Sequence, residues 1–415
     1  MRDVVPASGI TPMAQTFQTK PILESSWETN TLDTGAVIDE LTRLWAQLGG
    51  PEHGGEAPGE MVAESHAGGG GLMRANTLNL IAVAENQENA RLITETVAHL
   101  KNFLPSRTVV FITDEDPNRT KTWNVLVQLN EAWHSSSSAP ALRFETIIIS
   151  ADPKVAGHLA SLVSPLLMTE LPTFLWWPSG DFASSPIFRD LVEIVDRLIV
   201  DSAQLGNDAE TVAQLRTLLD DEDDPWVGDF TWSRLQPWCN LIAQFFDPNE
   251  VRDALNNISQ VNIAYAETRK DSSSGFAAAL LMVGWLGSRL GWEVLEPLER
   301  RKAGGWSAPL RVTTPSGKRR DVQIRLTTDQ SPEARFSLRS VELIARGEQD
   351  GTFRVIRTDK DDLITSSESS DAPYVSRMVY ARRYSTVEML GEQLQRFGPD
   401  RIFEDAIRFA TRLLP

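Results

Sequence analysis

Residues 171–182 read LPTFLWWPSGDF, an apolar run that stops at Pro178. In a β-strand, neighbouring side chains point to opposite faces, so Trp176 and Trp177 cannot enter the same core. A strand that buries both rings must lie inside a sheet that is covered on both faces. The stretch therefore predicts a central strand of a parallel sheet, with one tryptophan in each of two helical layers.

The segments around this strand alternate between buried strands and amphipathic helices. Further apolar runs that predict strands lie at 78–85, 107–114, 143–150 and 197–204. Strand–helix alternation with continuous apolar strands is typical of a mostly parallel sheet. The first half is therefore predicted to be a Rossmann-like α/β domain, in which the segment KTWNVLVQLNEAW at 121–133 is ambiguous.

The second half has a different pattern. Residues 275–292 are apolar nearly all round, which predicts a buried central helix. From residue 293 onward, short strands are separated by the turn signals TPSGKRR and GEQDG, as in hairpins. We expect a flexible N-terminus at 1–34, an α/β domain at 35–205 with a Gly-rich loop at 51–71, and an α+β domain with an antiparallel sheet at 206–415.

Composition limits the possible partners. The 415 residues are 41% hydrophobic and carry a net charge of −17, which makes nucleic acid and anionic membranes poor candidates. No run reaches the ~18 apolar residues of a membrane span, and the first residues lack a signal-peptide pattern, so a cytoplasmic location is expected. The single cysteine, Cys239, excludes an internal disulfide and is predicted to be a small buried side chain.

Charge is distributed unevenly along the chain. Residues 1–205 carry 13 Lys and Arg against 25 Asp and Glu, a net charge of −12. Residues 300–383 carry 17 against 11, a net charge of +6. Arginine is common on exposed faces of antiparallel strands, which is one interpretation. The other is that Arg377, Arg382 and Arg383, with the basic turn at 318–320, meet an acidic surface on a protein partner.

The residue types needed for catalysis do not gather into a motif. A dinucleotide site requires GxGxxG after the first strand, and this sequence has AENQEN there. The five histidines lack metal-ligand spacing, and there is no nucleophile elbow. The sequence therefore predicts no catalytic residue, no cofactor and no metal. The alternative that stays open is an enzyme or sensor that binds a sugar phosphate or nucleotide at the carboxyl edge of the α/β sheet.

Four segments together resemble the glucose-6-phosphate dehydrogenase assembly protein family (OpcA), in its cyanobacterial-like form. They are NTLNLIAVAE, LVSPLLMTELPTFLWWPSGDF, RLIVDSAQ and FTWSRLQPWCNLIAQFFD. The resemblance implies a protein that is not an enzyme. It implies a factor that binds glucose-6-phosphate dehydrogenase, promotes its active oligomer and acts as an allosteric activator in the oxidative pentose phosphate pathway. A structural scaffold with another client is a further alternative.

The resemblance also marks candidate docking residues and one departure. Trp176, Trp177, Pro178 and Asp181 lie in the segment characteristic of the family, and we nominate them for partner docking together with the arginines at 377, 382 and 383. Cyanobacterial members are linked to thioredoxin control through cysteines. With Cys239 alone, an intramolecular dithiol switch is excluded in this chain.

Overall fold

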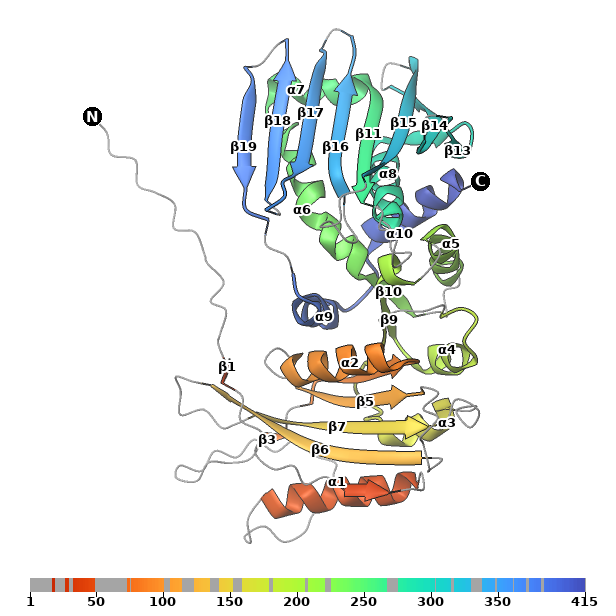
Figure 1. The fold of residues 1–415 in the computed structure, drawn as a ribbon, viewed down its shortest axis with the longest axis vertical. Coiled ribbons are helices and arrows are strands. Elements are labelled where there is room, and N and C mark those ends of the chain that lie inside the picture. The colour runs from red at the N-terminus through yellow and green to blue at the C-terminus, as the bar shows by residue number, and fades with distance from the viewer. Residues whose placement is uncertain are drawn as a thin grey trace, which may run out of the picture.

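The computed structural model arranges the chain around two β-sheets that lie one above the other (Figure 1). The residues that it describes are 17–18, 27–29, 33–48, 73–74, 76–100, 105–113, 123–134, 142–151, 159–178, 182–205, 208–220, 225–266, 275–302, 304–314, 317–329, 338–347, 349–360, 362–370, 373–381 and 384–414. The Gly-rich loop at 51–71 and most of the N-terminus at 1–34 lie outside the described residues.

The first sheet has the strand order β1-β6-β7-β5-β4-β8-β9-β10, with β2 on β6 and β3 on β7. Its strands are β1 (Phe17–Gln18), β2 (Trp27–Thr29), β3 (Met73–Arg74), β4 (Leu78–Ala84), β5 (Ser106–Ile112), β6 (Trp123–His134), β7 (Leu142–Ala151), β8 (Thr173–Trp177), β9 (Arg197–Val200) and β10 (Trp226–Asp229). From β7 to β10 every neighbouring pair is parallel. In chain order these six strands follow the Rossmann sequence 3-2-1-4-5-6, which confirms the predicted α/β class.

Helices cover both faces of this sheet, which is why its central strands are buried along nearly their whole length. All seven residues of β4 are buried. One face packs against α1 (Thr34–Leu48), α3 (Leu159–Val163) and α4 (Pro186–Leu191). The other packs against α2 (Gln87–Leu100) and α9 (Thr386–Leu394). The ambiguous segment at 121–133 forms β6, which runs antiparallel to β7.

The second sheet has the order β12-β14-β15-β11-β16-β17-β18-β19, with β13 on β14. Its strands are β11 (Ile258–Ala266), β12 (Trp292–Val294), β13 (Glu299–Arg300), β14 (Trp306–Thr313), β15 (Arg319–Asp329), β16 (Leu338–Ala345), β17 (Gly351–Arg357), β18 (Leu363–Ser369) and β19 (Val375–Val379). All its pairs are antiparallel except β11 with β15. The predicted α+β class is therefore confirmed.

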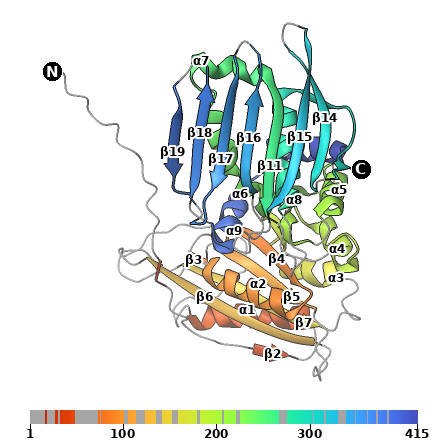
Figure 2. The ribbon, with the colours of Figure 1, turned by 45° about the horizontal axis from the view of Figure 1, so that its top comes forward.

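One face of the second sheet carries its helices. The remaining helices are α5 (Asp208–Leu218), α6 (Phe230–Gln244), α7 (Asn249–Arg252), α8 (Phe276–Leu290) and α10 (Arg401–Ala410). α6 and α8 pack on the sheet (Figure 2), and α10 packs on α8 (Figure 1). Burial in β16 alternates residue by residue from Val341 to Ala345, as expected for a sheet with one buried face. Among the described residues, helices cover only this face.

The chain crosses between the two sheets more than once. The expected boundary at residue 205 falls before β10, the last strand of the first sheet. α6 follows β10 directly and covers the second sheet. After β19, the chain returns to place Met389, Leu390 and Leu394 of α9 in the core of the first sheet. The first sheet is therefore completed by C-terminal residues.

Candidate functional site

Ligands of open α/β sheets bind outside the carboxyl ends of the strands, where the strand order reverses. Here that position lies between β4 and β8. Glu85 follows β4, and its carboxylate accepts a hydrogen bond from Ser185 Oγ at 2.9 Å. The Asn86 side chain accepts from the Asn89 backbone N–H at 2.8 Å, which caps the start of α2. Two of the chain's own side chains thus meet beside this position, and one of them is acidic.

The two tryptophans enter opposite layers, as predicted. Trp176 lies in the layer of α2 and α9, with 6.4 Å between its ring centroid and that of Phe230. Trp177 lies in the layer of α4 and packs edge-on against Phe188 at 5.6 Å. Both rings are 0% exposed, and Pro178 is buried beside them. Direct contact between these side chains and a partner would require the surrounding helices to move.

The other nominated docking residues lie elsewhere. Arg377 is exposed on β19, the outermost strand of the second sheet, far along the chain from the tryptophans. Asp181, Arg382 and Arg383 lie outside the described residues. The structure therefore does not bring Arg377 together with Trp176 and Trp177.

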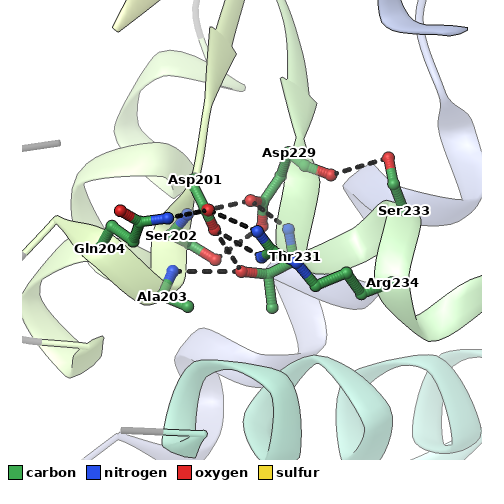
Figure 3. A network of polar contacts seen from close by, with 8 residues as sticks. All are labelled: Asp201, Ser202, Ala203, Gln204, Asp229, Thr231, Ser233 and Arg234. Atoms are coloured by element: carbon green, nitrogen blue, oxygen red, sulfur yellow. Dashed lines mark hydrogen bonds and ion pairs between the residues drawn. The ribbon is translucent and has the colours of Figure 1, made fainter. Parts of the chain in front are cut away.

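A buried polar network lies at the carboxyl ends of β9 and β10 (Figure 3). Asp201 follows β9 and is 1% exposed, and Asp229 ends β10 and is 0% exposed. Arg234 of α6 donates to both oxygens of Asp201, at 2.8 and 2.6 Å. Asp229 accepts from Ser202 N and Oγ, at 3.0 and 2.7 Å, and from Thr231 N at 2.9 Å. Asp229 is therefore the N-cap of α6.

The two carboxyl groups have opposite pKa shifts. Burial alone would raise the pKa of Asp201, but the charge and hydrogen bonds of Arg234 outweigh it and hold this pKa below its ordinary value. Burial, and secondarily the charge of Asp201, raise the pKa of Asp229 to about 6. Split pKa values are a property of acid–base pairs in enzymes. Here both carboxyl groups are buried and hydrogen-bonded to other residues of the chain. The network therefore has a structural role, which is to join β9, β10 and α6.

A second buried network anchors α9. Arg197 of β9 is 1% exposed, and its guanidinium donates to Gln393 Oε1 and to Gly398 O, each at 2.9 Å. Gln393 Nε2 in turn donates to Ser233 Oγ at 2.9 Å. Burial, and then the charge of Arg396, lower the pKa of Arg197 to about 10. Gly228 leaves the space for this contact, because a Cβ there would lie 2.3 Å from Gln393 Oε1.

Sequence reasoning missed these network residues. Asp201 lies within the predicted strand at 197–204, and Asp229 carries a signal because it directly precedes Phe230, where α6 begins, as an N-cap does. Arg197 and Gln393 have no such signal, because their partners are about 200 residues away in the chain.

Other site types can be assessed over the described part of the chain. Within it, no group of three or more His, Cys, Asp or Glu residues is placed to hold a metal ion. Cys239 is 6% exposed, and burial raises the pKa of its thiol. No helix among these residues is long and apolar enough to cross a membrane.

The fold and these networks define a two-sheet protein with a Rossmann-ordered first sheet, in which the carboxyl groups described after β4, β9 and β10 are hydrogen-bonded within the chain. Two family profiles match this chain. The N-terminal domain profile of the "Glucose-6-phosphate dehydrogenase subunit" matches residues 97–217, and the C-terminal domain profile of the same family matches residues 225–407. The chain belongs to the glucose-6-phosphate dehydrogenase assembly protein family, OpcA.

Relatives in two cyanobacteria carry the name "Putative OxPP cycle protein OpcA". The Synechocystis sp. protein is 25% identical over 275 residues, which are 65% of this chain and 56% of the relative. The Nostoc punctiforme protein is 26% identical over 277 residues, 65% of this chain and 57% of the relative. The chain thus spans little more than half the length of these relatives.

Among solved structures, the similarities are weak. The transcriptional regulator Gal80p of Kluyveromyces lactis has a TM-score of 0.43 and 9% identity, over 81% of this chain and 87% of that one. An oxidoreductase of Sinorhizobium meliloti has a TM-score of 0.38 and 13% identity, over 81% and 86%.

Proposed function

We propose that this chain is a non-catalytic assembly factor and allosteric activator of glucose-6-phosphate dehydrogenase, acting in the cytoplasm in the oxidative pentose phosphate pathway. Family membership supports the partner. The observation that carries the non-catalytic role is that the carboxyl groups described at the carboxyl edge of the first sheet are bonded within the chain. There, Glu85 is bonded to Ser185, and Asp201 and Asp229 are bonded to residues that build the fold.

An activator of this kind acts by binding one state of the dehydrogenase more tightly than another. The coupling free energy in allosteric systems is typically about 1–3 kcal/mol, or roughly 5- to 150-fold in affinity. Such coupling requires a binding surface on the chain and no reactive group.

The nominated docking residues take two roles in this proposal. Trp176, Trp177 and Pro178 support the fold from inside, because all three are buried. Arg377 contributes to the contact surface, because it is exposed. Asp181, Arg382 and Arg383, outside the described residues, remain nominated for docking.

The proposal is tested by mixing the purified chain with the dehydrogenase of the same organism. We expect the two proteins to co-elute in size-exclusion chromatography, and the apparent KM for glucose 6-phosphate to fall. Two folded proteins that elute separately, with unchanged kinetics, would contradict the proposal.

The alternative is a sugar-phosphate or nucleotide-binding protein, and the Rossmann strand order is the observation in its favour. A carboxylate at the reversal of strand order disfavours a phosphate there, by charge repulsion. A thermal-shift screen with glucose 6-phosphate, NADP⁺ and ATP separates the two. A large shift with the chain alone would favour the alternative.

A further inference from the structure

Exposed apolar side chains gather at one margin of the second sheet. Three of the four tyrosines in the chain lie between 374 and 384. In the structure, Tyr374 is 66% exposed, Met378 68% and Tyr380 82%. Aromatic residues, Met and Arg are enriched in the cores of protein–protein interfaces. We call residues 374–380, together with Ile356 and Ile364, the β19 margin.

The strand register places the apolar side chains of this margin in one row. Ile356 of β17 lies opposite Ile364 of β18, and Ile364 lies opposite Met378 of β19. Along β19, residues at alternating positions share a face, so 376 and 378 point to the same side, and the exposed Tyr374 and Tyr380 directly flank the strand. This is the side of the sheet away from α6 and α8, because Val355, next to Ile356, points into the buried core. The row is therefore open to a partner.

The centre of the same face is polar and paired within itself. Glu342 accepts from Arg354 and, at 2.6 Å, from Asn262 Nδ2. Asn262 also accepts from Gln260 Nε2 at 2.8 Å. These side chains satisfy one another, so the apolar row at the margin is the part of this face that gains most from being covered.

The margin is also a sheet edge. β19 pairs with β18, and no other described strand pairs with it. An unpaired edge presents backbone N–H and C=O groups that can accept a further strand, and many peptide complexes form in this way.

Charge identifies the kind of strand that fits. Residues 373–385, PYVSRMVYARRYS, contain three Arg and no Asp or Glu. A second copy of the chain paired at this edge would bring two such arginine-rich stretches together, and each chain carries a net charge of −17. An acidic strand has the opposite sign and avoids this repulsion.

We propose that an extended, acidic segment of the partner protein adds as a strand to the free edge of β19, with its apolar side chains on the row of Ile356, Ile364 and Met378. The identity of the partner as glucose-6-phosphate dehydrogenase rests on the proposed function. The inference adds the contact surface, the strand-addition geometry and the charge of the partner segment.

The first test removes the exposed apolar side chains without disturbing the fold. The double variant Met378→Ser/Tyr380→Ser is compared with Leu295→Ser/Ile402→Ser, in which two exposed side chains of the same chain but outside the margin are changed. We expect the first variant to bind the dehydrogenase at least about tenfold more weakly, and the second to bind as the wild type does. Far-UV circular dichroism and the thermal midpoint check that both remain folded.

The second test addresses charge and strand addition. Arg377→Glu is compared with Arg300→Glu, an exposed arginine on β13 of the same sheet. We expect only Arg377→Glu to weaken binding, and wild-type binding to weaken as salt is raised. In hydrogen-exchange mass spectrometry, the amides of 375–379 should become protected in the complex, as a new strand pairing requires.

The outcomes separate the two proposals. If the wild type does not bind the dehydrogenase, the proposed function fails and this inference fails with it. If the wild type binds and the margin variants bind equally well without protection of β19, the inference alone is overturned. A wild type that dimerises and becomes monomeric in Met378→Ser/Tyr380→Ser would show that a second copy occupies the edge, which also overturns it.

Discussion

At Trp177 the indole ring packs edge-on against Phe188 and is fully buried, and its N–H has no hydrogen-bond partner among the described residues. The ring therefore contributes through packing alone, and an unpaired buried donor costs stability. The neighbouring Trp176 can be equally large because its side chain fills the opposite layer. Residue-scale packing thus explains why the two tryptophans are adjacent.

Replacing Trp177 tests this packing role. Trp177→Ala should lower the free energy of unfolding by about 3–5 kcal/mol, since it leaves a cavity in a core that relaxes only in part. Trp177→Phe should lower the free energy of unfolding much less, because it keeps a ring against Phe188 and removes the unpaired N–H. Urea denaturation measures both. Trp177→Phe should also bind the dehydrogenase as the wild type does; loss of binding with the fold intact would indicate a direct contact.

Asp229 gives a prediction for pH. Its pKa is raised from 3.8 to about 6 in the folded state, so its contribution to stability is fully present below pH 3.8 and is lost as pH rises through about 6. Asp201 shifts the other way, and its contribution is lost only below pH 3.8. As pH rises from 4 to 7, the free energy of unfolding of Asp229→Asn should therefore increase by roughly 2–3 kcal/mol relative to that of the wild type.

Urea denaturation at several pH values measures this relative gain. Asp253→Asn, at an exposed carboxyl group, is the control and should show no such trend. If the difference in free energy of unfolding between the wild type and Asp229→Asn stays constant from pH 4 to 7, the raised pKa of Asp229 is contradicted.

At the scale of elements, α9 depends on contacts distant in the chain. A capping box at Ser385 and Glu388 starts this helix, but nine residues are too few for a stable isolated helix. Its position is fixed by its apolar residues in the first core and by Gln393, which bridges Arg197 and Ser233. The helix therefore forms where the first sheet offers both an apolar face and a buried cation.

Gln393→Ala should destabilise the chain by about 2–3 kcal/mol, because it leaves a hydrogen-bonding group of the buried Arg197 without its acceptor. The amides of α9 should then exchange faster than those of α10 in hydrogen-exchange mass spectrometry. Gln395→Ala, at an exposed position after the same helix, is the control and should have little effect.

Strands and helices that are buried along their whole length could be predicted from the sequence. The sequence predicts the strands β4, β5, β7, β8 and β9 and the buried helix α8, because a long apolar run can be accommodated in few structures other than a buried strand or helix. β10 was missed because it is four residues long and begins with an exposed tryptophan. β6 was ambiguous because its side chains alternate in burial at the margin of the sheet.

At the scale of the whole molecule, the two sheets are linked by continuous elements. α6 extends from β10 onto the second sheet, and α9 returns to the first. The two buried networks lie at this junction, where Ser233 and Arg234 of α6 contact Gln393 and Asp201. Partly unfolding one sheet would expose charges that the other sheet's helices now satisfy.

The two sheets should therefore unfold together. In urea, hydrogen-exchange mass spectrometry should give the same midpoint for peptides of β4 and of β16, and circular dichroism should give that midpoint too. Gln393→Ala is expected to separate the two midpoints. Separate midpoints in the wild type would show that the sheets are independent units.

The sequence by itself determined the α/β and α+β classes, the opposite orientations of Trp176 and Trp177, and the family, because these follow from local patterns of apolar residues and from characteristic segments. Only the tertiary structure decided that β10 and α9 complete the first sheet, that Asp201, Asp229 and Arg197 are buried in paired networks, and that the apolar row at β19 lies open. The physical reason is that burial and pairing join residues far apart in the chain, 201 positions for Arg197 and Gly398 and more for the packed rings of Phe174 and Phe397, and no local pattern records such contacts.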